Sequence, residues 1–209
     1  MANIALRRAR KAQRRKQVVA GKRQAEAFEA SLAGQVGRAA EVPIQHCLLT
    51  ESLFESGLGT LVLARGRTPH YVALSTFLID TFCLGIKDVM FRPVEAEEFA
   101  TYVEIMGAAA PLVPVEPGYA RRLLRELAAW AQSIGFPPHR DFTVVERTFG
   151  TVDAGACDVA FRFGRDGKPF YVPGPTESPS LIRRRLKQLQ KGLGEDGFDF
   201  EAPIFEAPI

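Results

Sequence analysis

The feature that most constrains the fold is a long apolar stretch in the middle of the chain, from Tyr71 to Ile79 and again from Phe82 to Phe91. Many of its residues are β-branched or aromatic, and its polar and apolar positions alternate only loosely. This pattern predicts two strands, each partly buried on both faces, or one long bent strand. Gly85 is expected to mark a bulge or a close approach to another backbone.

Shorter periodic segments lie on both sides of this stretch, separated by Gly and Pro residues. The expected strands are 43–49, 60–64, 156–163 and 169–172, the last two joined as a hairpin about Asp166-Gly167, and the expected helices are 3–33, 95–106, 117–134 and 178–191. Residues 111–117 read as an extended linker, and 143–149 fits a strand or a helix. Strands and helices each cluster along the chain, which predicts an α+β fold with a mainly antiparallel sheet packed with helices.

Three parts are expected along the chain: a basic helical arm at 1–37, an α+β domain at 42–192 and an irregular tail at 193–209. Gly34 and Gly37 are expected to end the helix of the arm. The tail repeats Phe-Glu-Ala-Pro-Ile in tandem at 200–204 and 205–209. We interpret it as a docking peptide for a protein partner.

The basic arm is the most informative feature for function. Residues 1–23 contain nine basic residues and no acid, so with a net charge of +3 for the whole chain the remainder carries −6. The basic residues are Arg7, Arg8, Arg10, Lys11, Arg14, Arg15, Lys16, Lys22 and Arg23. Such a segment neutralises phosphates, and Arg-rich arms often fold on RNA. We expect it to bind nucleic acid, RNA or the ribosome more than DNA; a solubilising tail is the alternative.

A second basic cluster is expected on the last helix, at Arg183, Arg184, Arg185, Lys187 and Lys191. It either extends the surface of the arm or is an ordinary solvated helix face. Lipid headgroups are a weaker candidate partner, because the arm offers no Trp, Phe or Leu face for insertion.

The remaining composition indicates a cytoplasmic protein with no membrane partner. The chain has no run of about 18 apolar residues, and no apolar stretch follows the basic segment as it would in a secretory signal. Its three cysteines, Cys47, Cys83 and Cys157, are far apart and form no CxxC motif. We therefore expect free thiols and predict neither a metal site nor a cofactor.

Acidic residues leave an enzymatic alternative open. Asp80 and Asp88 lie in the apolar stretch, where a charge is unfavourable unless it is paired or used. With Asp141 or Asp153 they could hold the two Mg²⁺ ions of a phosphodiesterase or nuclease. Ion pairs with Lys87 or arginines are the structural interpretation, which we favour.

His139 adds a second enzymatic interpretation. It shares a Pro-stiffened loop with Asp141, and with Cys47 or Cys83 it would suggest a Cys–His hydrolase, although no oxyanion-hole motif accompanies it. The candidate catalytic residues are therefore Asp80, Asp88, His139 and Asp141, and the sequence does not decide whether the protein is an enzyme.

Two segments resemble an uncharacterised family of bacterial proteins. The first runs from Pro43-Ile44 through Gly57-Leu58-Gly59 to 77–88, and the second covers 129–142 with Gly135-Phe136-Pro137-Pro138-His139. The resemblance implies a family but no activity. Taken together, the residues favour a non-enzymatic nucleic-acid-associated protein, with a metal-dependent phosphodiesterase and a protein-interaction module as alternatives.

Overall fold

The fold is built on a five-stranded antiparallel sheet. A computed structural model describes residues 27, 29–67 and 70–201. The strands lie in the order β4-β3-β2-β1-β5, and every neighbouring pair is antiparallel. They are β1 (Ile44–Thr50), β2 (Leu58–Arg65), β3 (Tyr71–Asp80), β4 (Gly85–Glu95) and β5 (Leu112–Pro114). With the helices packed on it, this sheet confirms the predicted α+β class.

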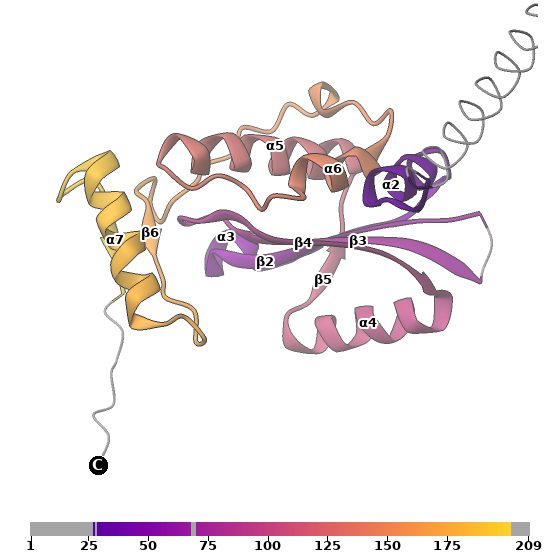
Figure 1. Ribbon diagram of the computed structural model, residues 1–209, viewed down its shortest axis with the longest axis horizontal. Coiled ribbons are helices and arrows are strands. Elements are labelled where there is room, and N and C mark those ends of the chain that lie inside the picture. The colour runs from indigo at the N-terminus through magenta and orange to yellow at the C-terminus, as the bar shows by residue number, and fades with distance from the viewer. Residues whose placement is uncertain (1–26, 28, 68–69, 202–209) are drawn as a thin grey trace, which may run out of the picture.

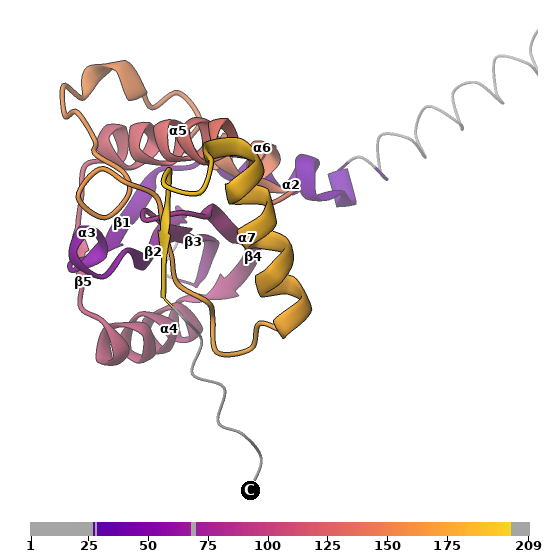
Figure 2. The same cartoon turned by 90° about the vertical axis from the view of Figure 1, so that its left-hand side faces the viewer.

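Helices cover both faces of the sheet (Figures 1 and 2). One face carries α2 (Leu32–Ala40), α5 (Pro117–Ser133) and α6 (Phe142–Val145), and the other carries α4 (Ala96–Ala109). The short α3 (Leu53–Ser56) precedes β2. At one end of the molecule lie α7 (Pro179–Leu193) and a parallel pair formed by β6 (Phe170–Tyr171) and β7 (Asp199–Phe200).

The central apolar stretch forms two strands, β3 and β4, joined by a tight turn. The turn ends at Gly85, which has a φ of 69°. A Cβ atom on this residue would lie 2.4 Å from the Cβ of Ala131 in α5. Gly85 therefore allows the sheet and α5 to approach closely, one of its two expected roles.

The main core lies between the sheet and α5. Leu123, Leu124, Leu127 and Ala131 follow one another at helical spacing on α5, and all four are fully buried. The leucines pack against inward-facing sheet residues such as Leu61, Leu63 and Phe77. A smaller core on the opposite face joins Phe99 of α4 to the sheet.

The expected end of the first helix at Gly34 and Gly37 is wrong. Ser31 caps a helix that begins at Leu32 and continues through both glycines to Ala40, its hydroxyl accepting a hydrogen bond from the Gly34 amide. A glycine inside a helix costs about 1 kcal/mol. Val36 is almost completely buried in the main core, and its burial offsets this cost.

The predicted hairpin at 156–172 is also wrong, although its turn forms. Asp166 and Gly167 have the positive φ angles that an Asp-Gly turn requires. The flanking segments do not pair with each other, and only Arg165 and Lys168 form a bridge. Phe170 and Tyr171 pair instead with β7, because both flanks bury their aromatic side chains against other parts of the fold.

Two further segments, the 111–117 linker and the tail, differ in detail from the sequence-based expectation, and the structure decides a third that was left open. The 111–117 linker contains β5, which pairs with β1 at the edge of the sheet, where a proline such as Pro114 is tolerated. The ambiguous 143–149 segment is helical, formed by α6 and the 3₁₀ helix η1 (Glu146–Phe149). Within the tail that we expect to be irregular, Asp199 and Phe200 form β7.

Candidate nucleic-acid interface

Helix α7 is amphipathic and is attached to the body by its apolar side. Ser178 caps it, accepting a hydrogen bond from the Leu181 amide at 3.3 Å, and Pro179 lies in its first turn. Ile182 and Leu189 are buried in a cluster that includes Phe136. This docking fixes which side of α7 faces outward.

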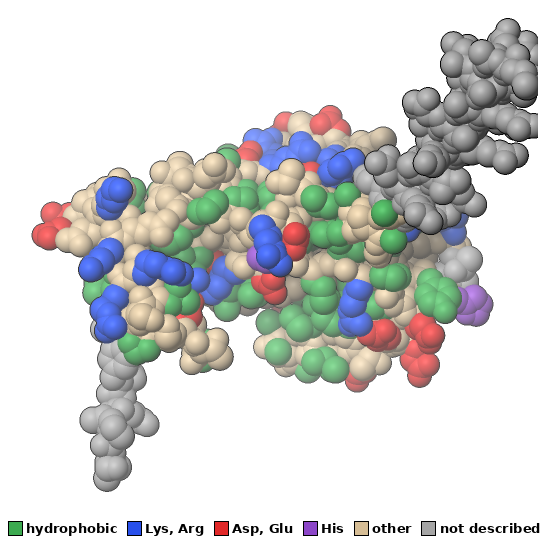
Figure 3. All heavy atoms as spheres, viewed as in Figure 1, with side chains coloured by type: hydrophobic (Ala, Val, Ile, Leu, Met, Phe, Trp, Pro, Cys, Tyr) green, Lys and Arg blue, Asp and Glu red, His purple; other side chains and the backbone are tan. Residues whose placement is uncertain are grey.

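The outward side of α7 carries four exposed cations, which we call the α7 basic face: Arg183, Arg184, Lys187 and Lys191. At 100° per residue they fall within an arc of about 100°, and at 1.5 Å per residue they span about 12 Å. No acidic residue occurs in α7, and within the described part of the chain none of the four forms an ion pair. Lys and Arg side chains gather over this end of the molecule (Figure 3).

Arg185 belongs to a different, internal cluster. Its guanidinium pairs with the carboxylate of Glu177 and lies 5.9 Å from the centre of the Tyr171 ring, whose hydroxyl donates to the same carboxylate. Burial and the neighbouring Glu177 raise the pKa of Tyr171 to about 12. Arg185 therefore anchors α7 to the body, and its charge is already used. Its position three residues after Ile182, on the apolar side of the helix, is a sequence signal that distinguishes it from Arg183 and Arg184.

The predicted arm residues lie outside the described part of the chain: Arg7, Arg8, Arg10, Lys11, Arg14, Arg15 and Lys16. The described chain begins beside α2, at the end of the molecule opposite α7 (Figure 1). That the arm and the α7 basic face act as one surface therefore stays a prediction.

Asp80 has a structural position. Its side chain is buried, and one carboxylate oxygen accepts hydrogen bonds from the amides of Phe82 and Cys83 at 3.0 and 2.9 Å. Burial raises the pKa of this carboxyl above its ordinary value, outweighing these amides and the charge of Lys87. The carboxylate thus organises the turn between β3 and β4.

The structure brings the other three catalytic candidates together at the surface. His139 Nε2 lies 3.7 Å from an oxygen of Asp88, and its Nδ1 lies 4.0 Å from an oxygen of Asp141. The Asp88 side chain is 68% exposed. Among the described residues, no group of three or more His, Cys, Asp or Glu side chains is arranged to hold a metal ion.

Neither buried cysteine joins this cluster. Cys47 and Cys83 lie in two separate hydrophobic clusters of the core. Burial, assisted by the charge of Glu116, raises the pKa of the Cys47 thiol to about 12, and burial also raises the pKa of Cys83. These thiols are therefore protonated and poorly nucleophilic at neutral pH.

Asp153, the remaining acidic candidate, caps a short 3₁₀ helix, and its carboxylate accepts a hydrogen bond from the Gly155 amide at 2.8 Å.

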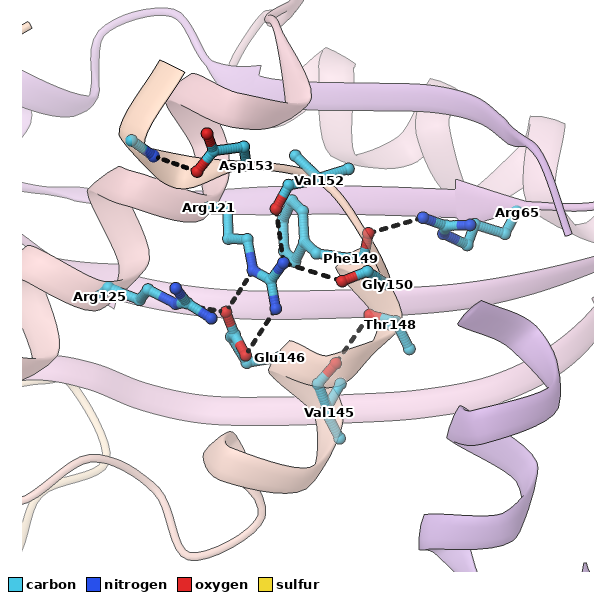
Figure 4. A network of polar contacts seen from close by, with 11 residues as sticks. Arg65, Arg121, Arg125, Val145, Glu146, Thr148, Phe149, Gly150, Val152 and Asp153 are labelled. Carbon is cyan, nitrogen blue, oxygen red and sulfur yellow. Dashed lines mark hydrogen bonds and ion pairs between the residues drawn. The ribbon is translucent and has the colours of Figure 1, made fainter. Parts of the chain in front are cut away.

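A polar network that the sequence analysis did not identify holds the segment after α6 against α5 (Figure 4). Arg121 and Arg125 each donate to Glu146 at 2.7 Å, and Arg121 also binds the carbonyl oxygens of Gly150 and Val152. Burial raises the pKa of Glu146, but the two arginines outweigh it and hold this pKa below its ordinary value. The network is structural. The sequence does not indicate it, because Glu146 lies more than 20 residues after both arginines and no local pattern links them.

No family model, curated protein or solved structure matches the chain. No helix in the described ranges is long and apolar enough to span a bilayer. Function is therefore inferred from the residues themselves.

Proposed function

We propose that the protein binds RNA in the bacterial cytoplasm through phosphate contacts, using the arm at 1–23 and the α7 basic face on a non-enzymatic α+β body. The charge segregation carries this proposal: nine positive charges without an acid lie in one short segment, whereas the rest of the chain carries −6. Positive charge is concentrated in particular segments and is not spread evenly along the chain, so an anionic partner is expected to bind at those segments.

The α7 basic face supports the same partner independently of the arm. Its four cations point outward with no ion pair inside the described chain, so phosphate contacts would not have to break existing pairs. A lipid surface is a poorer partner, because the apolar side of α7 packs against the body and offers nothing for insertion. RNA is favoured over DNA because arginine-rich segments commonly fold on RNA.

Binding of a labelled single-stranded RNA across a salt series tests the proposal. For single strands, log K falls with log salt by about 0.7 for each phosphate contact. Removal of residues 1–23 should therefore weaken binding and flatten the slope, by as much as about 6 if all nine charges make contacts. Replacement of those residues by a neutral segment of equal length is the control for chain length and should behave like the deletion. Equal affinities with flat salt slopes for the natural chain and the chain without residues 1–23 would reject the proposal.

The phosphodiesterase alternative stays a prediction. Asp88 lies 3.7 Å from His139, but Asp80 is hydrogen-bonded within the β3–β4 turn, and the described residues contain no group arranged to hold a metal ion. Its test is cleavage of RNA and DNA with Mg²⁺ or Mn²⁺ by the natural chain and by Asp80→Asn and Asp88→Asn variants. Cleavage that is lost with Asp88→Asn would support it. Cleavage that both variants leave unchanged, or no cleavage by the natural chain, would remove it.

The docking of the tail on a protein partner is tested by a pull-down with and without residues 200–209.

A further inference from the structure

A groove of about 820 Å³ lies beside α3. Three aromatic rings line it, from three separate segments: Phe54 of α3, Tyr119 of α5 and Phe161. Phe54 is 39% exposed, although a phenylalanine has no polar atom to favour a surface position. The remaining wall includes Arg162 and the turn residues Gly164, Asp166 and Gly167.

The aromatic rings form a connected ladder. The Phe161 ring lies 6.0 Å from that of Phe54, with the two planes only 8° from parallel, and 5.1 Å from that of Tyr119 in an edge contact. The Phe163 ring lies 6.1 Å from that of Phe161, and the Trp130 ring lies 5.4 Å from that of Phe163. Phe161 belongs to a segment without helix or strand, so ring contacts hold it in place. The shape of the groove wall is therefore preorganised, which lowers the entropy lost when a ligand binds there.

The wall also carries groups that suit a nucleotide. Arg162 is exposed and, within the described residues, forms no ion pair, so its guanidinium is free for a phosphate. Asp166 offers a carboxylate that can accept hydrogen bonds from N–H groups of bases, such as N3–H of uracil. Flat apolar faces beside one free cation are the combination with which proteins bind single-stranded nucleic acid without sequence preference.

We propose that this aromatic groove stacks one or more bases of a single-stranded nucleic acid. The inference rests on the proposed function and deepens it: the basic segments hold the phosphates, and the exposed ring of Phe54 stacks on a base.

The test compares an oligouridine with an abasic strand of the same length and charge. The natural chain should prefer the base-bearing strand by about 5- to 150-fold for each stacked base. Phe54→Ala and Phe54→Leu should both reduce this preference toward one and leave the salt slope unchanged, because neither alters a charge. Phe54→Leu keeps an apolar side chain, so its loss of preference would identify stacking as the interaction. Thermal unfolding of each variant checks that the fold is retained.

The matched control is Tyr71→Ala, which removes an aromatic ring that is 61% exposed at the opposite end of β3. It should leave the preference for base-bearing strands intact. Equal binding of both strands by the natural chain, with a normal salt slope, would overturn the groove inference and leave the proposed function standing. A base preference with no salt slope would overturn the proposed phosphate contacts alone.

Two competitors exclude other occupants. Excess uridine monophosphate that displaces the oligonucleotide completely would assign the groove to free nucleotides and overturn the inference. Displacement by a Phe-Glu-Ala-Pro-Ile peptide, in a chain that shows no base preference, would assign the groove to peptides and also overturn it. Weak competition by the nucleotide and none by the peptide is the expected result.

Discussion

Glu146 is held by two arginines, and its side chain is only 10% exposed. Because its folded-state pKa is lowered, the carboxylate stabilises the fold above its ordinary pKa of 4.5, and this contribution disappears as the pH falls through the folded-state value. Glu146→Gln should therefore lower the free energy of unfolding by about 2 kcal/mol at neutral pH.

Urea denaturation of both chains from about pH 3 to pH 7 measures this linkage. The difference between the natural chain and Glu146→Gln should be complete at neutral pH and should shrink below pH 4.5. A difference that is the same at all pH values would show that the charge of Glu146 contributes nothing.

Asp80 has the opposite linkage. Its folded-state pKa is raised by burial, so stability from this group is greatest at low pH and falls as the pH rises through the folded-state value. Asp80→Asn keeps an oxygen that accepts from Phe82 and Cys83 and removes the charge, so it should unfold at the same or higher urea concentration at pH 7. Asp80→Ala leaves both amides without their acceptor and should lose about 1–2 kcal/mol. If Asp80→Asn proves the more damaging change, the charge itself is required and the structural assignment fails.

Among the secondary-structure elements, the junction of β4 and α5 depends on a single glycine. Gly85→Ala would place a Cβ 2.4 Å from that of Ala131 at a positive φ, so it should lower the free energy of unfolding by more than about 1 kcal/mol. Gly192→Ala in α7 is the control, since its new Cβ would lie 3.7 Å from the carbonyl oxygen of Ile134, an ordinary contact distance. The control should be neutral or stabilising by up to about 1 kcal/mol in the same denaturation experiment. Equal effects would mean that β4 and α5 do not approach as described.

The docking of α7 is tested by two neighbouring positions. Leu189 is fully buried, so Leu189→Ala should lower the free energy of unfolding by about 2–5 kcal/mol. Lys187 is exposed, and Lys187→Ala should stay within about 0.5 kcal/mol. Similar small values for both would show that α7 is not packed on the body, and the assignment of an outward basic face would fall with it.

Elements with strong internal periodicity could be predicted from the sequence, and those defined by distant contacts could not. The stripe from Leu123 to Ala131 and the apolar run of β3 and β4 carry their own pattern. The hairpin about Asp166-Gly167 does not form, because Phe161 packs against Phe54 of α3 and Tyr119 of α5. No local sequence pattern indicates these contacts. The role of Asp80 depended on its place before a turn, and that of Arg185 on its contact with Glu177.

At the level of the whole molecule, positive charge is concentrated in two segments on an otherwise acidic chain. The arm at 1–23 and the α7 basic face are separated by most of the sequence, and the fold fixes the second of them on a docked helix. If both contact one RNA, their contributions to the salt dependence should add, because each phosphate contact releases its own counterions. Charge position, not net charge, is then the quantity that controls binding.

The most direct measurement of this claim is the salt slope of RNA binding for two variants with the same net charge. One carries Arg183→Gln and Lys187→Gln on the α7 basic face. The other carries Arg67→Gln and Arg147→Gln, two exposed cations elsewhere on the surface that form no ion pair with the described residues. The first should lower the slope of log K against log salt by about 1.4, which corresponds to two phosphate contacts, and the second should leave it unchanged. Identical slopes for the two variants would contradict the account, because the position of the charges would then have no effect on binding.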